Sequence, residues 1–395
     1  LLLSLCLFAQ MPYSSMPRFN RWLNNDEFVI NTKMNGSATA SDFVYNINTK
    51  QYSPAPAVVK DEKLMSVKEG DIFVKVNGVE KQITSDKKEK KNPTLSPDGQ
   101  YVAYTQNNNL YTVSVADAKV TAITNETTKG ILNGYASWVY FEEIFGRPTK
   151  YRAFWWSPDS KYISFMRFDE RQVPMFPIYV SDGQHGYIEE TRYPKAGDPN
   201  PTVKIGWTSP TGGAITWADF NEQEDQYFGW PIWNPNNNSM WMSWMDRGQN
   251  NLKIYELDMA TGAKKEVYKE YQKTWIDLED RVSGRINFLA DNKGYIAQSD
   301  ETGWNQLYMY GMDGKLDHAI TNGKFTITSI KNIDEKNKTI YFTARGIENT
   351  ARVDFYSIGF DFLAFFESVG FVEVLTCISD FLIDLVYNGL VSLGV

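Results

Sequence analysis

The sequence predicts an all-β fold built from repeated strand–turn–strand units. Aromatic residues, which favour strands, make up 15% of the 395 residues and include 12 Trp and 23 Tyr. Short segments of alternating apolar and polar residues are separated by clusters of Pro, Asp, Asn and Gly, a pattern typical of strands joined by turns. Outside the C-terminal segment no long run has helical periodicity, so we do not expect strands alternating with long helices.

The repeated unit is clearest in LSPDGQYVAYTQNNNLYTVSV, residues 95–115. A turn is followed by the alternating strand that begins at Tyr101, by a polar turn at 107–109, and by an antiparallel partner over 110–115. The unit recurs at 156–168, 233–258, 289–314 and 333–358, and in a weaker copy at 25–49. Trp155 and Trp156, at the start of one copy, are expected to pack within it.

The spacing of these units distinguishes between two all-β architectures. Turn-to-turn distances of about 40 to about 80 residues suit four-stranded blades that carry insertions. Radial packing of such blades makes a β-propeller. A β-sandwich is the alternative, but it does not predict a recurring unit with a fixed strand order. We therefore predict a β-propeller of four-stranded antiparallel blades over residues 11–358.

Composition excludes several classes of function. The net charge of −8 provides no basic surface for nucleic acid. Cys6 and Cys377 lie near the two ends, so the main domain has no cysteine framework or cysteine metal site. No metal and no cofactor are predicted.

The two ends differ from the middle of the chain. Residues 1–10, LLLSLCLFAQ, resemble the apolar core of a secretory signal peptide, which predicts an exported, periplasmic or cell-envelope protein. A buried strand and a lipid anchor at Cys6 are the alternatives. The segment 361–395 contains no Lys, Arg or Pro, and acids interrupt it every few positions, so we expect no stable membrane insertion. We interpret residues 359–395 as an out-of-frame or otherwise foreign tail, with an amphipathic helix as the alternative.

A search for catalytic motifs finds none of the common ones. GxSxG, the P-loop, HExxH and GxGxxG are all missing from the sequence. The two histidines, His185 and His318, lie in turn-like segments and are expected at the surface. These residues by themselves suggest a recognition domain.

Two adjacent acids stand out in SWVYFEEIFGR, residues 137–147. Glu142 and Glu143 have aromatic and aliphatic neighbours, which makes two adjacent negative charges costly to maintain. Both side chains could converge on one ammonium group, which offers three charge-assisted donors. The alternative is a solvated acidic loop paired with Arg147 or Lys150, and spacing alone favours that alternative.

A family resemblance changes this balance. The stretch 137–147, followed by YRAFWWSPDSKYISFMRFDERQVPMFPIY (151–179) and RYPKAGDPNPTVKIG (192–206), resembles the dipeptidyl peptidase IV family of serine exopeptidases, bacterial members most closely. The resemblance covers most of residues 20–358. It implies an N-terminal propeller, generally of eight blades, followed by an α/β-hydrolase domain. It also implies that Glu142 and Glu143 grip the free amino terminus of a peptide substrate.

The resemblance carries further expectations about activity. Family members release dipeptides from oligopeptides and prefer Pro or Ala as the second residue, without a cofactor. They often form homodimers, so the full-length enzyme is expected to be capable of dimerising. The chain is interpreted as the substrate-gating propeller of such an enzyme. The alternatives are a stand-alone protein-binding propeller and a tripeptidyl or acylaminoacyl peptidase relative.

The sequence departs from the family pattern in two places. The family's nucleophile, acid and histidine lie in the hydrolase domain, and the pattern is lost near residue 358. We therefore expect an incomplete propeller, no hydrolase domain and no peptidase activity in this chain. The family also places an arginine against the substrate carbonyl, whereas KDEKLMSVKEGDIFVKV (60–76) has no Arg. Lys63 is the candidate substitute, although a lysine lacks the bidentate fork.

Overall fold

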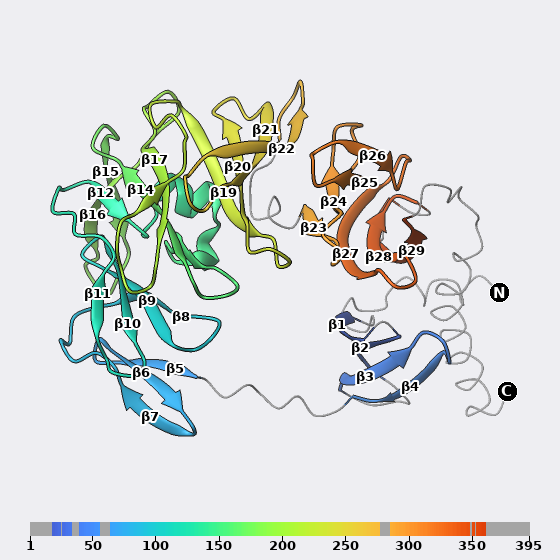
Figure 1. Cartoon of the computed structure of the whole chain (residues 1–395), viewed down its shortest axis with the longest axis horizontal. Helices are drawn as coiled ribbons and strands as arrows, with labels where there is room; N and C mark the ends of the chain where they lie inside the picture. Colours follow the sequence, from blue (N-terminus) through green and yellow to red (C-terminus); the bar gives the residue numbers. More distant parts are fainter. Residues whose placement is uncertain are drawn as a thin grey trace. The chain divides into compact units, whose positions relative to one another are not determined.

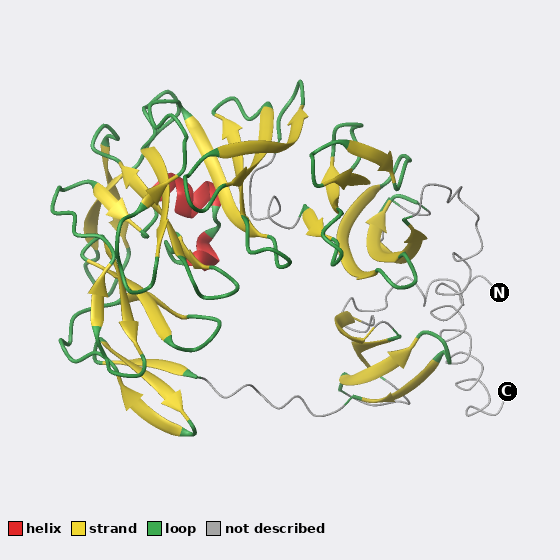
Figure 2. Cartoon of the chain, viewed as in Figure 1, coloured by secondary structure: helices red, strands yellow, loops and turns green. Residues whose placement is uncertain are grey.

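The computed structural model describes residues 18–24, 26–33, 39–55, 64–276, 285–347, 350–351 and 353–360. These residues are mainly strands joined by turns, and helix is confined to short turns within 138–149 (Figure 2). The all-β prediction is confirmed. The expected signal peptide, Lys63 and the tail from 361 onward lie outside the described residues.

The strands form antiparallel sheets of neighbours in the chain (Figure 1). Four of the described sheets have four strands, as predicted for propeller blades. They comprise β1 (Arg18–Asn24), β2 (Glu27–Thr32), β3 (Ser41–Asn46) and β4 (Gln51–Pro54); β8 (Lys91–Leu95), β9 (Tyr101–Gln106), β10 (Asn109–Ser114) and β11 (Val120–Ala122); β19 (Gln226–Trp233), β20 (Met240–Asp246), β21 (Asn251–Leu257) and β22 (Lys264–Tyr271); and β23 (Ile286–Phe288), β24 (Gly294–Ser299), β25 (Gln306–Gly311) and β26 (Leu316–Ala319).

The remaining sheets vary this plan. Two have three strands, namely β5 (Met65–Lys68), β6 (Asp71–Val76) and β7 (Val79–Gln82), and β27 (Thr326–Asp334), β28 (Thr339–Arg345) and β29 (Val353–Gly359). A five-stranded sheet contains β12 (Ile131–Asn133), β13 (Phe154–Trp156), β14 (Ile163–Asp169), β17 (Thr202–Thr208) and β18 (Thr216–Trp217). The hairpin of β15 (Met175–Val180) and β16 (Tyr187–Arg192) is inserted between β14 and β17.

The described residues belong to two compact units. One unit takes its described residues from 1–60, 302–307 and 318–395, and the other takes them from 61–301 and 308–317. In the first unit an aromatic cluster joins the β1–β4 sheet to the β27–β29 sheet. Its ring centroids lie 5.0 Å apart for Trp22 and Tyr341 and 5.9 Å apart for Phe28 and Phe355.

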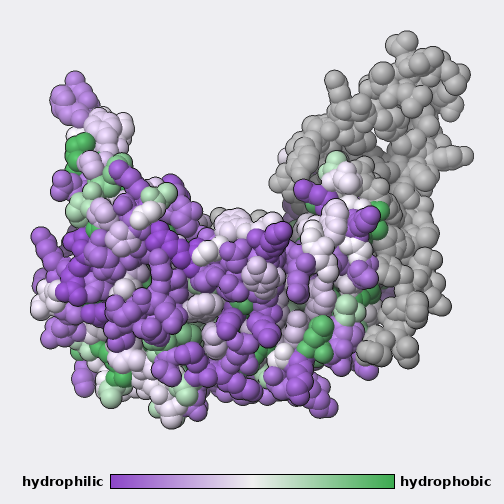
Figure 3. Space-filling model, turned by 90° about the horizontal axis from the view of Figure 1, so that it is seen from above, coloured by the Kyte–Doolittle hydropathy of each residue, from purple (hydrophilic) through white to green (hydrophobic). Residues whose placement is uncertain are grey.

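The second unit contains the larger core and the paired acids. Its fully buried aromatic side chains come from several sheets and include Trp207, Trp241, Phe165 and Phe228. Burial of such large rings supplies most of the driving force for packing one sheet on the next. On the face drawn in Figure 3, the described surface is mostly hydrophilic, with hydrophobic residues scattered among polar ones.

The recurring Ser-Pro-Asp motif has a local physical cause. The Ser157 hydroxyl donates to Asp159 at 2.7 Å and accepts the backbone N–H of Tyr162 at 3.0 Å. Ser96 does the same with Asp98, at 2.6 Å, and with the N–H of Tyr101. The motif therefore closes the turns that precede β9 and β14, because a side chain satisfies backbone groups that the ladder leaves free.

A second repeated device closes the outer strand of a sheet. A threonine hydroxyl just past that strand accepts a backbone N–H from the neighbouring strand. This holds for Thr84 with Ile72 at 2.8 Å, Thr124 with Leu110 at 3.0 Å, and Thr321 with Leu307 at 2.9 Å. The Thr124 hydroxyl also donates to the Asn109 side chain at 2.9 Å.

Replacing Thr124 with Val should lower the free energy of unfolding by about 1–3 kcal/mol, because the buried N–H of Leu110 loses its acceptor while side-chain shape is retained. The measurement is urea unfolding of the purified chain. Thr127→Val, at an exposed position three residues away, is the matched control. Equal stability of the two variants would show that the threonine contact contributes nothing.

Candidate functional site

The paired acids lie on a short π-helical turn, η3 (Tyr140–Ile144). The turn is closed by the N–H of Phe145, which donates to the carbonyl of Tyr140 at 2.7 Å. Tyr140 and Ile144 are its buried residues, whereas Glu142 is half-buried and Glu143 is exposed. Single π-turns recur at functional sites because the extra residue redirects side chains. The turn therefore exposes Glu143 and leaves Glu142 partly within the protein.

Tyr140 anchors this turn. Its side chain is 1% exposed, and its hydroxyl accepts the backbone N–H of Phe228 in β19 at 3.1 Å. The rings of Phe145 and Phe168 pack edge-on against it, with centroids 5.4 and 4.8 Å away. Burial raises the pKa of Tyr140, so the phenol stays neutral. The turn is thus fixed between β14 and β19.

The two carboxylates differ in their surroundings. The Glu142 side chain is 21% exposed, and its Oε1 accepts hydrogen bonds from Nε of Arg147, at 3.0 Å, and from Nη2 of the same guanidinium. Its other oxygen, Oε2, is buried and has no hydrogen-bond partner in the described part of the chain. Glu143 makes no hydrogen bond or ion pair with a described residue. Between Arg147 and Lys150, the two cations considered from the sequence, the structure places Arg147 against Glu142.

An aromatic stack lies beside the acids, and sequence reasoning missed it. Phe141 stacks on Tyr151 at 3.8 Å, and Tyr151 stacks on Tyr135 at 4.9 Å. The Nζ of Lys91 lies 4.7 Å from the Tyr135 ring centroid. Burial, together with nearby glutamates, raises the pKa of Tyr135 to about 12. The stack forms because an isolated antiparallel bridge sets residue 135 opposite residue 152, next to Tyr151, a contact that the sequence does not indicate.

Glu170 is a second residue that the sequence did not reveal. It follows β14 and is partly buried. Burial raises its pKa to about 7, while Arg192 acts in the opposite direction and Asp169 adds to the rise. A carboxyl that titrates near neutrality is uncommon and is often found near functional sites.

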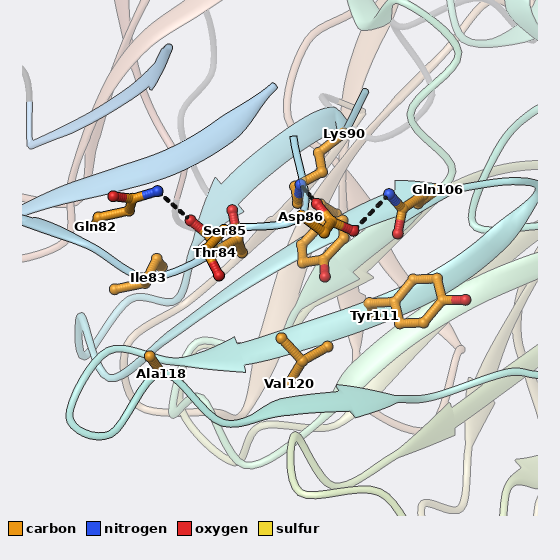
Figure 4. A pocket seen from close by; sticks show the side chains of 11 residues that line it. Gln82, Ile83, Thr84, Ser85, Asp86, Lys90, Gln106, Tyr111, Ala118 and Val120 are labelled. Carbon is orange, nitrogen blue, oxygen red and sulfur yellow. Dashed lines mark hydrogen bonds and ion pairs between the residues drawn. The ribbon is translucent and has the colours of Figure 1, made fainter. Parts of the chain in front are cut away.

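A cavity of about 560 Å³ lies between β7 and the β8–β11 sheet in the same unit (Figure 4). Figure 4 shows Asp86 between Lys90 and Gln106, the latter donating at 3.2 Å. The hydrogen bond from Lys90 lowers the pKa of Asp86 to about 2. Lys90 also donates to the carbonyls of Gly70 and Lys88, each at 3.0 Å. Its charge is therefore satisfied within the protein, which marks a structural ion pair.

Other chemistry can be assessed only for the residues that the structure describes. These contain no group of three or more His, Cys, Asp or Glu side chains that could hold a metal ion. His185 is exposed, and Nε2 of His318 lies 3.1 Å from the carbonyl of Phe360. Trp156 donates to the carbonyl of Thr94 at 3.1 Å, and Trp155 packs near Phe145, as expected for packing residues. No described helix has the length and apolarity that a membrane crossing requires.

Comparisons with known proteins agree on one family. A family model of the dipeptidyl peptidase IV (DPP IV) N-terminal region matches residues 30–387. Dipeptidyl peptidase 4 of Arthroderma otae is 33% identical over 274 residues, which cover 66% of this chain and 34% of that protein. Dipeptidyl peptidase 4 of Trichophyton rubrum is 33% identical over 280 residues, which cover 67% of this chain and 35% of that protein. The chain thus spans about a third of the length of these relatives.

A solved structure shows the same fold. The crystal structure of Porphyromonas gingivalis dipeptidyl peptidase 4 matches with a TM-score of 0.64 at 20% sequence identity. The match covers 88% of this chain and 52% of that one.

Glu170 should make stability depend on pH. Its pKa in the folded state, about 7, exceeds the ordinary value of 4.5, so between these values the folded chain retains a proton that the unfolded chain has lost. The free energy of unfolding should therefore fall as pH rises through this window, and then level off. Glu170→Gln should remove this pH dependence, so the free energy of unfolding of the variant should rise relative to that of the parent between pH 4.5 and 7. Urea unfolding at several pH values measures this difference in the free energy of unfolding, and Glu224→Gln, at an exposed position, is the control. A difference between parent and variant that does not change with pH would contradict the prediction.

Proposed function

The chain belongs to the dipeptidyl peptidase IV family, and from that premise we propose that Glu142 and Glu143 hold the free amino terminus of a peptide substrate. The observation that supports this proposal is the state of Glu142. One of its oxygens is buried without a partner among the described residues, and the next residue in the chain, Glu143, carries a second carboxylate with no described partner. A buried carboxylate oxygen without a donor is costly, and an incoming cation would offset that cost.

The chemistry of an ammonium group suits this arrangement. A peptide amino terminus offers three N–H donors and one positive charge. Each hydrogen bond to a carboxylate contributes roughly 1.5–3 kcal/mol when it is charge-assisted. An acetylated terminus has neither the charge nor enough donors, and it would leave the buried oxygen of Glu142 unpaired. The site should therefore discriminate free from blocked amino termini.

Arg147 balances the charge of the site. Two carboxylates and one guanidinium sum to a net charge of −1, which matches a single ammonium. Both of its hydrogen bonds go to Oε1 of Glu142, so Oε2 is left for a ligand. The Arg147 side chain is 71% exposed, and an exposed ion pair contributes little stability. Its role in the proposal is to orient Glu142.

Clamping one end of a peptide fixes where the rest of it lies. With the amino terminus held, only one peptide bond would reach a nucleophile at a set distance, so dipeptides would be released. We propose that this clamping sets the cleavage position in the complete enzyme, a serine-type peptidase with preference for Pro or Ala as the second residue. Lys63 is retained in the proposal as a contact to the substrate carbonyl that supplies charge without a fork.

Two further points belong to the proposal. Export to the periplasm or cell envelope rests on the signal-like composition of residues 1–10. Homodimerisation of the full-length enzyme is compatible with the β15–β16 hairpin, where Tyr179, Tyr187 and Ile188 are exposed. Such exposed apolar side chains are typical of surfaces that contact another chain.

Two alternatives differ in measurable ways. A stand-alone binding propeller would recruit a protein without requiring a free amino terminus. A tripeptidyl or acylaminoacyl peptidase would differ in the length or blocking of its product. The names of the matched relatives, dipeptidyl peptidase 4, favour release of dipeptides.

Binding should depend on the paired acids. A tripeptide with Pro at its second position should bind the 395-residue chain at least about tenfold more tightly with a free than with an acetylated amino terminus. The double variant Glu142→Gln with Glu143→Gln should lose this preference, because neutral amides attract an ammonium only weakly. NMR titration of the peptide signals measures both affinities. Glu222→Gln with Glu224→Gln removes the same charge from another loop, and an equal loss in that control would refute the assignment.

The 395-residue chain by itself should not turn over substrate. Its sequence contains no GxSxG nucleophile motif. We therefore expect no release of chromophore from a Gly-Pro chromogenic amide above the rate of buffer alone. Steady turnover that copurifies with the chain and is absent from a mock purification would contradict this expectation.

A further inference from the structure

A second cavity lies on the loop that follows the paired acids. It has a volume of about 450 Å³, within the range typical of ligand pockets. Its walls come from β8, from β19 and from residues 145–152. None of its lining residues is acidic, whereas Lys150 and Arg152 are both cationic. A cationic cavity is unexpected in a chain with a net charge of −8.

Arg152 is the unusual residue of this cavity. Its side chain is partly buried, and it makes no hydrogen bond or ion pair with any residue that the structure describes. Burial lowers the pKa of Arg152, and no carboxylate opposes that effect. By contrast, Lys90 is paired with Asp86 and Arg171 with Asp169 in the same unit. A charge kept partly out of water without a partner is costly unless an anion supplies what the protein does not.

The loop holds Arg152 in place through an unusual backbone. Lys150 and Tyr151 both adopt left-handed conformations, with φ of 52° and 68°. This region is uncommon for residues other than glycine. The Asn92 side chain, on another wall of the cavity, donates to the carbonyl of Lys150 at 2.8 Å and ties the loop to β8.

Part of the remaining wall is apolar, beside the polar residues Asn92, Thr94 and Thr149. Phe145 and Trp230 meet edge-on, with ring centroids 6.3 Å apart, and Pro93 and Pro148 complete the surface. A bare inorganic anion would leave these rings unused. A ligand that joins a carboxylate to an apolar side chain would engage both parts of the cavity.

We propose that this cavity binds the C-terminal carboxylate of a peptide whose last residue is apolar. Arg152 pairs with the carboxylate through its planar fork, and Lys150 adds a second positive charge. The last side chain lies against Trp230, which packs edge-on on the buried ring of Phe145. The inference rests on the proposed function only in taking a peptide as the ligand.

The test uses probes that cannot engage the paired acids. N-acetylphenylalanine carries the carboxylate and the ring but no ammonium, and N-acetylphenylalaninamide lacks the charge. On the 395-residue chain the acid should bind at least about tenfold more tightly than the amide, by NMR titration. The Glu142→Gln, Glu143→Gln variant should still bind the acid more tightly than the amide, so this result and that of the proposed function can fail separately.

Variants then assign the contact. Arg152→Met should reduce binding of the acid to that of the amide, and Arg152→Lys should retain part of it because a lysine keeps the charge without the fork. Lys293→Met removes a cation of which 84% of the side chain is exposed, and it should have no effect. Circular dichroism and thermal unfolding check that each variant is folded.

Three outcomes would overturn the proposal. The first is equal binding of acid and amide by the parent, which remains decisive even if Arg152→Met does not fold. The second is a folded Arg152→Met that binds the acid as the parent does. The third is displacement of the acid by sulfate at equal concentration, which would identify a site for small inorganic anions and not for a peptide terminus.

Discussion

The burial of Tyr140 is the interaction on which the candidate site depends. Its ring fills the core beside Phe168, and its hydroxyl accepts an N–H from Phe228, a residue 88 positions away. A short π-turn has too few internal hydrogen bonds to persist alone. Tertiary packing must therefore hold it, and the packing orients Glu142 and Glu143 as a consequence. Core and site are thus connected through one side chain.

Charge pairing separates structural from functional candidates within the second unit. Lys90 and Asp86 are paired with each other, so the larger cavity has no unpaired charge among its lining residues. Glu142 is only half satisfied, because Arg147 occupies one of its oxygens, and Arg152 has no described partner. These two incomplete groups lie on the same short segment of chain and have opposite charges. A ligand with an ammonium at one end and a carboxylate at the other has the chemistry that both would recognise.

Local signals in the sequence predicted the local structure well. The Ser-Pro-Asp motif predicts a turn followed by a strand, and the structure shows why, since Ser157 and Asp159 satisfy the backbone there. The adjacent acids were noticeable because like charges in an apolar segment are rare. The stack of Tyr135 on Tyr151 and the raised pKa of Glu170 left no local signal, because each depends on residues brought together from distant positions.

By itself, the sequence determined the all-β class, the repeated antiparallel units and the identity of the two adjacent acids, because each follows from residue type and short-range spacing. Only the tertiary structure decided that Arg147 takes one oxygen of Glu142, that the other oxygen is buried, and that Arg152 lines a cavity without an acidic partner. Burial and pairing depend on which segments pack together. That packing is a sum of many weak contacts across the chain, and no single stretch of sequence encodes it.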